Sequence, residues 1–426
     1  MHCKRCPVLA EVKKTIAANM LRSFPQSNRG QIGRELEFPL ITKSKQPGES
    51  QRVIETLLTQ GARPLYKDER LVGAQFELFS FCSEAGRSTI EWVSTPCADL
   101  HALKSQTLQA LSTLNQALVV HDYQLLGLGI HPYETPGAKA RTPKVHYQSL
   151  AKVLGHRWDW FTVICGDHVH IDTCQRQLLS MTSALDMAIP FVVAQCANSP
   201  LKDQALCDID SYREYYQFQH RLEPSRHGIV GEPITSMEQL IEPRFEEQFL
   251  LHHSKCSGTY SAVGVPFSDW VRHHVASSQE VWEAFQFHQH YTWNSVRARQ
   301  EYGTIEVRAG CLPPEQYLWL YPAIITGLST CHKEVTDLIL SFLPDKSDRL
   351  QWYQDCLKGG AGVKYHELHR QLEALAHQGL ERRGLGEETM LVHPELNPAQ
   401  QFRNAVLKSS FDSAILERIY DLNNVN

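Results

Sequence analysis

The segment GRELEFPL, residues 33–40, carries two glutamates two positions apart within a pattern typical of a half-buried β-strand. Residues two apart in a strand point to the same face of the sheet, so Leu36 and Phe38 share one face. Glu35 and Glu37 share the other face. Two neighbouring carboxylates either face water or face a cation, and the residues elsewhere in the chain decide between these two possibilities.

Three later segments repeat this alternation of apolar and polar residues. They are STIEWVS (88–94), DHVHID (167–172) and TIEVR (304–308). Their polar faces carry Thr89, Glu91, His168, His170, Asp172, Thr304, Glu306 and Arg308. Solvated strand faces usually mix Thr, Ser, Lys, Arg and Gln, whereas these faces collect carboxylates and imidazoles. We therefore interpret the four strands as lining a common cation site.

The ligand types indicate which cation to expect. Like charges opposite one another across strands destabilise a sheet, and a cation between them removes the repulsion. Oxygen ligands with an occasional imidazole suit Mg²⁺ or Mn²⁺ better than zinc. A divalent cation beside an arginine suggests phosphoryl chemistry, because both groups neutralise phosphate oxygens. The P-loop pattern GxxxxGK[ST] is absent from the sequence, so a nucleotide would be held by another scaffold.

Length and composition set broad limits on the class of protein. The chain has 426 residues, of which 42% are hydrophobic and 21% are charged, as in ordinary globular proteins. A net charge of −5 argues against a nucleic-acid partner, which would require a basic patch. The sequence has no apolar run of about 18 residues, and its start lacks the apolar core of a signal peptide. We therefore expect a cytoplasmic protein with small-molecule partners and no membrane segment.

The twelve cysteines are scattered along the chain, and Cys3 and Cys6 form the only CxxC pair. Without a second pair at a suitable spacing, a four-ligand zinc site is poorly supported. Most of the cysteines are therefore expected to be buried free thiols. Whether Cys3 and Cys6 form a regulatory disulfide is left open by the sequence.

The spacing of apolar residues predicts helices over residues 50–61, 98–120 and 175–197, and strands over 123–130 and 160–173. Strands concentrate before residue 310, and the pattern after it is helical. This distribution indicates an α+β fold with an antiparallel or mixed sheet.

No convincing domain linker is visible in the sequence. We therefore predict a single catalytic domain over residues 1–426. It would include an N-terminal segment, residues 1–30, and a helical C-terminal part, residues 314–426.

Eight motifs, in the same order along the chain, resemble those of one enzyme family. They are GRELEF (33–38), STIEWVSTP (88–96), LGLGIHP (126–132), GDHVHID (166–172), CANSP (196–200), SYREYYQFQHR (211–221), GTIEVRAG (303–310) and GLERRGLGEETML (379–391). Each motif alone is weak evidence, whereas eight in register are specific. The chain resembles glutamate–cysteine ligase family 2, which contains the plant-type enzymes and bacterial carboxylate–amine ligases of the glutamine-synthetase-like superfamily.

The resemblance implies both a fold and a reaction. The fold would be a curved, mainly antiparallel sheet whose concave face holds ATP, Mg²⁺ and substrate. In the reaction, the γ-carboxylate of glutamate would attack the γ-phosphate of ATP, giving an acyl phosphate. The amine of cysteine would then displace phosphate, and the product would be γ-glutamylcysteine, a precursor in glutathione biosynthesis.

The resemblance also implies roles for individual residues. The metal ligands would be Glu35, Glu37, Glu84, Glu91, His168 and Glu306. Arg308 would stabilise the transferring phosphoryl group, and His170 would lie near the nucleotide phosphates. Asn198 and Ser199 would line the substrate or nucleotide side. The candidates for binding substrate carboxylates are Arg213, Arg226 and Arg297.

Two departures from the family pattern leave the acceptor amine open. The segment LKDQALCDID, which follows ANSP, lacks the glycine that the family often has there, and STIEW lacks the preceding Gly-Gly-Gln of the plant enzymes. A ligase for a different amine or acid is therefore one alternative. A metal-dependent phosphotransferase for a small metabolite is another. A catalytically inactive binding module is disfavoured, because no proposed ligand is replaced by an uncharged residue.

Overall fold

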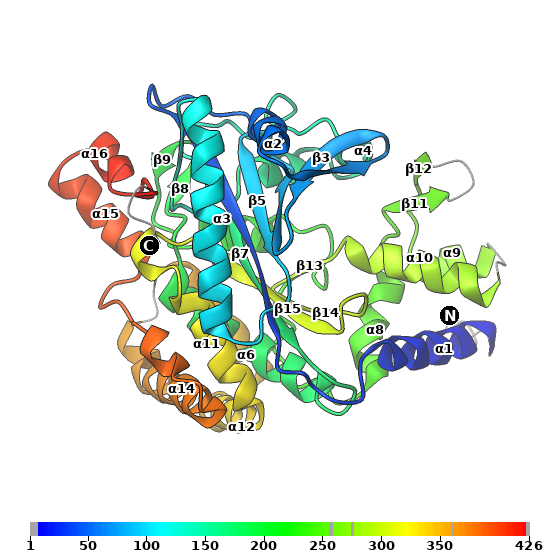
Figure 1. Ribbon diagram of the computed structural model, residues 1–426. Helices are drawn as coiled ribbons and strands as arrows, with labels where there is room; N and C mark the ends of the chain where they lie inside the picture. The colour runs from blue at the N-terminus through cyan, green and yellow to red at the C-terminus, as the bar shows by residue number, and fades with distance from the viewer. Residues whose placement is uncertain (1–6, 255–258, 274–276, 360–361, 423–426) are drawn as a thin grey trace.

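A computed structural model describes residues 7–254, 259–273, 277–359 and 362–422 (Figure 1). The nine cysteines within these ranges are free thiols, and most of them are buried, as expected. Cys3 and Cys6 lie outside the described residues, so the question of a disulfide between them stays open.

A nine-stranded sheet forms the centre of the protein, in the order β14-β15-β7-β1-β5-β4-β3-β2, with β6 also paired to β1. All neighbouring strands in it are antiparallel. The strands are β1 (Ile32–Thr42), β2 (Arg63–Lys67), β3 (Arg70–Gln75), β4 (Phe79–Ser83), β5 (Thr89–Ser94), β6 (Tyr123–Leu125), β7 (Gly166–Asp172), β14 (Val296–Arg299) and β15 (Thr304–Cys311). The predicted α+β class with an antiparallel sheet is confirmed.

The remaining elements lie before, between and after these strands. The helices are α1 (Pro7–Ser23), α2 (Ser50–Thr59), α3 (Leu100–Val120), α4 (Val145–Leu154), α5 (His156–Asp159), α6 (Leu178–Cys196), α7 (Tyr212–Gln219), α8 (Met237–Glu246), α9 (Phe267–His273), α10 (Ser278–His290), α11 (Leu320–Thr330), α12 (His332–Phe342), α13 (Lys346–Leu357), α14 (Gly362–Arg383), α15 (Pro398–Lys408) and α16 (Phe411–Leu416). Short 3₁₀ helices are η1 (Trp160–Thr162), η2 (Glu315–Tyr317) and η3 (Glu387–Met390). Three two-stranded pairs join β8 (Leu201–Lys202) to β9 (Ala205–Leu206), β10 (His227–Gly228) to β13 (Trp293–Asn294), and β11 (Leu251–Ser254) to β12 (Thr259–Ala262).

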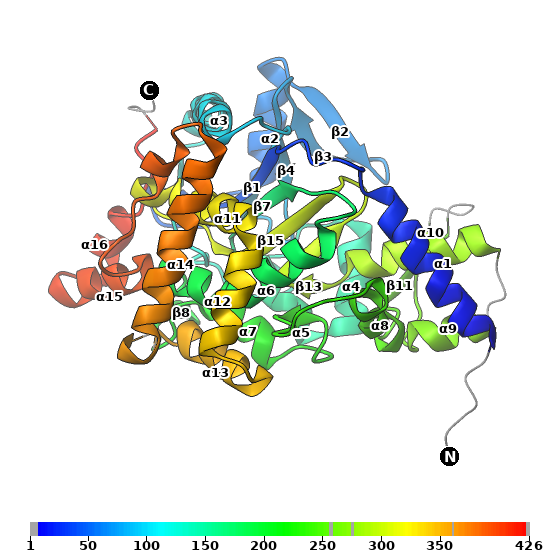
Figure 2. The same cartoon turned by 90° about the horizontal axis from the view of Figure 1, so that it is seen from below.

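The apolar face of the sheet builds the main core. Leu36 and Phe38 of β1, Trp92 of β5 and Val169 of β7 are buried in one hydrophobic cluster. Helices α3, α6 and α11 contact the sheet and contribute to the same cluster. Figure 2 shows the C-terminal helices α11 to α14 gathered on one side of the molecule, with α1, α8, α9 and α10 on another. The period-two pattern of GRELEFPL thus fixes which face of β1 meets the helices.

Two helices of the C-terminal region pack unusually closely. A Cβ at Gly327 of α11 would lie 2.1 Å from the carbonyl oxygen of Ala376 in α14, and a Cβ at Gly379 would lie 2.0 Å from the carbonyl oxygen of Gly327. Only glycine lets the backbones approach to this degree. The helical C-terminal region is confirmed, and the division into one domain stays a prediction.

Helix α6 is apolar along its whole length. Among the described helices it alone is long and apolar enough to cross a membrane, with a mean hydropathy of 1.4, and 78% of that window is buried inside the protein. It contacts β14 and β15 and the helices α11, α12 and α13. Such burial is typical of a core helix.

Two predicted strands are shorter in the structure than expected. The strand predicted over 123–130 ends at Leu125, and the strand predicted over 160–173 begins only at Gly166. The apolar side chains of the remaining parts, Leu128 among them, pack into a second hydrophobic core. A continuous apolar run signals burial, and it cannot by itself distinguish a strand from buried irregular chain.

Candidate active site

The four strands with carboxylate and imidazole faces are neighbours in the sheet, in the order β15-β7-β1-β5. Glu35 pairs with His168, and Glu37 pairs with Glu91 across the strands. Glu306 pairs with His170. The polar residues therefore meet on the face of the sheet opposite the main core.

An acidic trio occupies one part of this face. Ligand oxygens of Glu37, Glu84 and Glu91 all lie within 4.8 Å of one another. Glu37 and Glu91 come from paired strands, and Glu84 directly follows β4. Burial, followed by the charge of Glu84, raises the pKa of Glu37 to about 7. The same two causes raise the pKa of Glu91 well above its usual value. Burial and the neighbouring carboxylate therefore disfavour the ionised forms of Glu37 and Glu91.

Gly166, at the start of β7, makes room for this arrangement. Its backbone N–H donates a hydrogen bond to Glu37 Oε2. A Cβ at this position would lie 2.6 Å from both His168 Nε2 and Arg213 Nη2, and 3.0 Å from Glu37 Oε2. A side chain at position 166 would therefore displace the side chains of His168 and Arg213 from these positions.

Glu35 lies between the two histidines of β7. His168 Nδ1 is 3.1 Å from Glu35 Oε2, and His170 Nε2 is 3.2 Å from Glu35 Oε1. Arg213 Nη2 donates to His168 Nε2 at 3.1 Å, so this nitrogen is an acceptor and Nδ1 carries the proton that faces Glu35. Burial, with the charge of Arg308, lowers the pKa of His168 to about 3. Burial acts to raise the pKa of Glu35, but the hydrogen bonds from both histidines outweigh it and lower that pKa.

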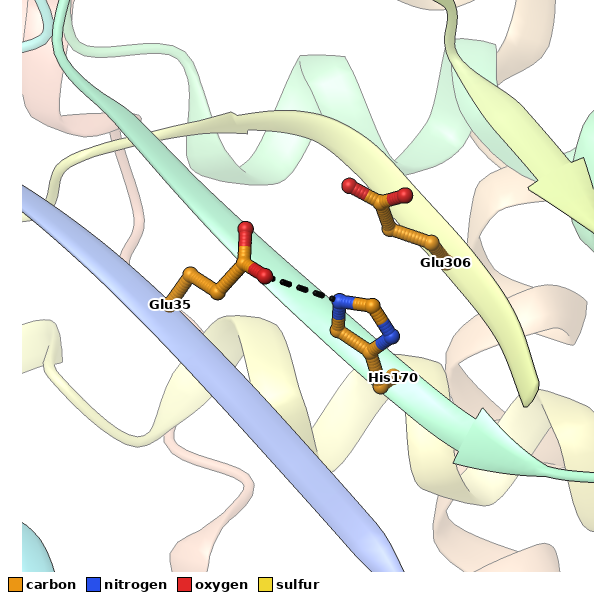
Figure 3. Close-up of side chains that lie close together, drawn as sticks. All are labelled: Glu35, His170 and Glu306. Carbon is orange, nitrogen blue, oxygen red and sulfur yellow. Dashed lines mark hydrogen bonds and ion pairs between the residues drawn. The ribbon is translucent and has the colours of Figure 1, made fainter. Parts of the chain in front are cut away.

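Glu306 is neutralised by arginines. Arg297 Nε lies 2.6 Å and Arg299 Nη1 2.8 Å from Glu306 Oε2, and Arg308 Nη1 donates to Oε1. Burial acts against ionisation, but the charges of Arg297, Arg308 and Arg299 hold the pKa of Glu306 well below its usual value. Figure 3 shows Glu306 on the same side of the sheet as Glu35 and His170. Ligand atoms of Glu35, His170 and Glu306 lie within 4.8 Å of one another.

The acidic trio is a better site for a divalent cation than the group of Glu35, His170 and Glu306 is. Its donors are all carboxylate oxygens, which suit Mg²⁺ or Mn²⁺. Burial first and the charge of Glu84 second raise the pKa values of Glu37 and Glu91, and a divalent cation would offset both effects. The carboxylate of Glu306 already has arginine partners, and a cation there would compete with them.

Two cavities meet at Glu35. The acidic cavity, of about 280 Å³, is lined by residues that include the trio, His168, Arg213 and Arg308. The second cavity, of about 720 Å³, is lined by residues that include Arg29, His170, Asp172 and Tyr302. Glu35 lines both cavities.

Several predicted site residues are not at the surface of either cavity. The guanidinium of Arg226 is fully buried and donates to Glu223 and to the carbonyls of Tyr291 and Gln248. The amide of Asn198 donates to the carbonyls of Gly127 and Leu312. These hydrogen bonds give both residues a structural role.

Ser199 and Arg297 also make protein contacts. The Ser199 hydroxyl accepts from the backbone N–H of Arg213, so Ser199 positions a residue of the acidic cavity. Arg297 lines that cavity, but its guanidinium donates to Glu306 and to the carbonyls of His290 and Thr292. It therefore holds Glu306 in place.

The sequence reasoning missed three cations of the acidic cavity, namely Arg299, Lys67 and Lys144. Arg299 had a detectable signal, because the sequence VRAR places it two residues from Arg297 on the strand next to TIEVR. Lys67 and Lys144 stand alone in their segments and gave no comparable signal.

An antiparallel sheet whose polar face gathers carboxylates and imidazoles agrees with the fold that the motif resemblance implied. The model of glutamate-cysteine ligase family 2 matches residues 31–242, from just before β1 to within α8. This match, over just under half of the chain, supports a ligase of the glutamate–cysteine ligase type. The matched region includes every member of the acidic trio but not Glu306 or Arg308, which the sheet brings to the same face.

The comparison with solved structures gives distant likenesses. The glutamate–cysteine ligase of Francisella tularensis in complex with AMP is 12% identical, with a TM-score of 0.48, over 94% of this chain and 91% of that one. A bifunctional glutathione synthetase from Pasteurella multocida is 12% identical, with a TM-score of 0.47, over 95% of this chain and 53% of that one, so this chain spans about half its length. No curated protein matches the chain. Because both TM-scores are low, the family match carries the assignment.

Mg²⁺ is expected to stabilise the protein through the acidic trio. A ligand that binds only the folded state, at 100 times its Kd, raises the free energy of unfolding by about 2.7 kcal/mol. We expect a gain of this order for the wild type in urea unfolding, and a much smaller gain for Glu91→Gln. The exposed Glu77→Gln is the control and should respond like the wild type. An equal gain for Glu91→Gln and the wild type would rule out the trio as the binding site.

Proposed function

We propose that the protein is an ATP-dependent ligase that joins glutamate to cysteine through the γ-carboxylate. The observation that carries this proposal is that the acidic trio and the arginines around Glu306 line one cavity, which Glu35 shares with a second cavity. The trio would hold Mg²⁺ or Mn²⁺, and Arg308 would bind phosphate oxygens.

The second cavity is the proposed site of the nucleotide. Its size is within the usual range for small-molecule sites. The ring of Tyr302 offers a surface for the base, and Arg29 offers a charge near the cavity wall. His170, at the boundary near Glu35, would then lie beside the phosphates. The AMP bound in the Francisella tularensis ligase agrees with nucleotide use in this family.

In the first step, a γ-carboxylate oxygen of glutamate attacks the γ-phosphorus of ATP, and the bond to ADP breaks. Bound Mg²⁺ would neutralise charge on the phosphate oxygens. Arg308 donates hydrogen bonds to the transferring group, and Arg297 and Arg299 keep Glu306 and Arg308 in position. The charged side chains of the protein therefore need not reorganise during the step, and such preorganisation is the usual source of electrostatic catalysis.

In the second step, the amine nitrogen attacks the acyl carbon, and phosphate leaves. The attacking ammonium loses its proton beforehand, and a carboxylate of the cleft with a raised pKa is a suitable acceptor. Burial raises the pKa of Glu37 to about 7. With a cation on the trio Glu37 would lose this basicity, so the ammonium proton would pass to water before attack, and the departing phosphate would take the second N–H proton as the amide forms.

The product distinguishes this proposal from its alternatives. The protein is incubated with ATP, Mg²⁺, glutamate and each of a panel of amines, and ADP and organic products are measured by mass spectrometry. We expect ADP and a dipeptide in equal amounts with cysteine. A dipeptide with another amine only would point to a different ligase, and a phosphorylated small molecule would point to a phosphotransferase.

A further inference from the structure

The acidic cavity must bind the negative charge of its substrates, yet most of its arginines are already engaged. Arg297, Arg299 and Arg308 donate to Glu306. Both terminal nitrogens of Arg213 donate to His168 and to the carbonyl of Arg308. An amino-acid substrate that places its γ-carboxylate beside the phosphates still has an α-carboxylate that needs a cationic partner.

Lys67 and Lys144 are cations of this cavity without a carboxylate partner. Lys67 is the last residue of β2, and Lys144 is the N-cap of α4. Both line the acidic cavity, and among the residues that the structure describes neither ammonium forms an ion pair. Lys144 donates to the carbonyl of Ser83 and lies 5.1 Å from the centre of the Tyr147 ring, so two of its three N–H groups remain available.

The two ammonium groups are close enough to repel one another. Burial, followed by the charge of Lys144, lowers the pKa of Lys67. The position of Lys67 is fixed by a two-residue hairpin turn, in which Asp68 and Glu69 have φ angles of 50° and 60°. Such a turn is tight, and it holds the end of β2 in one place. Asp68 and Glu84 act on the pKa of Lys67 in the opposite direction, but neither forms an ion pair with its ammonium, which leaves that group able to bind a further carboxylate.

The sheet separates these lysines from the arginines. Lys67 lies on β2, at one edge of the sheet, and Arg297 lies on β14, at the other edge. The trio lies between them, on and beside β1, β5 and β4. Both groups nevertheless line the same cavity, so a substrate whose reacting carboxylate is at the phosphates can turn its other carboxylate toward the lysines and away from the engaged arginines.

We propose that Lys67 and Lys144 bind the α-carboxylate of an amino-acid substrate. The inference rests on the proposed ligase function and adds the residues that select an amino acid over a simple acid or amine. The carboxylate belongs either to glutamate or to the acceptor, and the same chemistry serves both.

The test compares substrates that differ only in this carboxylate. Glutamate is compared with 4-aminobutyrate, and cysteine is compared with cysteamine, in Lys67→Met, Lys144→Met and the wild type. Each lysine variant should raise KM for the carboxylate-bearing member of one pair by about ten- to hundredfold, with little change in kcat. Turnover of the matching analogue should stay as in the wild type, and Lys→Arg should restore part of the loss. The affected pair identifies the substrate.

Lys152→Met is the matched control, because Lys152 is an exposed lysine of α4 that lines neither cavity. It should behave as the wild type. Variants that lose activity equally with both members of each pair, or that keep the wild-type preference, would overturn the inference. If the wild type forms no product with any pair, the ligase proposal fails. In that case, calorimetric titration measures the Kd of each of the four compounds for the wild type and for the lysine variants. Equal Kd values in the variants and the wild type would overturn the lysine inference independently of the ligase proposal.

Discussion

Arg308→Ala is expected to lower substrate-dependent ADP release by on the order of 10²- to 10³-fold, the range for loss of one preorganised donor to a transition state. Arg308 lines the acidic cavity, and its guanidinium is held by Glu306, which is itself held by Arg297 and Arg299. A side chain fixed in this way stabilises developing phosphate charge without reorganising. The alanine substitution removes this positive charge, and water would occupy the space of the guanidinium.

The measurement is steady-state ADP release with saturating ATP and glutamate, with urea unfolding as a check on the fold. Arg308→Lys should recover only part of the rate, since lysine lacks the planar fork of arginine. The control is Arg370→Ala, which removes an exposed arginine paired with Glu367 on α14. Glu306→Ala should also abolish ADP release. Turnover near the wild-type rate in folded Arg308→Ala would exclude its proposed role.

Asp167→Ala is expected to lower the free energy of unfolding by about 3–5 kcal/mol, because it leaves a buried arginine without its partner. Arg34 and Asp167 form a two-pronged ion pair, with 2.9 Å from Nε to Oδ1 and 2.6 Å from Nη2 to Oδ2. Both side chains are fully buried, and Arg34 Nη2 also donates to the carbonyl of Leu318. Burial raises the pKa of Asp167 despite the arginine, so the pair only partly offsets its own desolvation.

This prediction is tested by urea unfolding of two variants and a control. The double variant Arg34→Met, Asp167→Leu removes both charges and should recover most of the lost stability, because an apolar pair of similar volume replaces a buried ion pair at little cost. The exposed pair of Arg370 and Glu367 is the control, and Glu367→Ala should change stability by less than about 1 kcal/mol. A similarly small effect for Asp167→Ala would show that Arg34 finds another partner or water.

The sheet and one face of the site were predictable because they depend on a local pattern. Alternation at Glu35 and Glu37, at His168 and His170, and at Glu306 is a property of each strand alone. Four such strands with the same unusual polar face indicated a common site, and the sheet order places them side by side.

Other features could not be predicted, because they depend on partners that are far away in the sequence. Arg226 was a reasonable candidate for a substrate contact, yet its partners are carbonyls and glutamates from other segments. Arg34 sits on the apolar face of β1, and nothing within GRELEFPL indicates that Asp167 lies opposite it. Lys67 reaches the cavity only because β2 is the edge strand of the finished sheet.

Glu35 lines both cavities. Its carboxylate contacts His168, which lines the acidic cavity, and His170, which lines the second cavity. If a ligand in the second cavity changes the charge or position of this carboxylate, it also changes the affinity of the acidic cavity for its own ligand. The change corresponds to a coupling free energy between the two ligands. By thermodynamic linkage, the acidic cavity acts back on the second one by the same factor. Nucleotide and amino acid would therefore report on each other's binding through one side chain of β1, whichever of them arrives first.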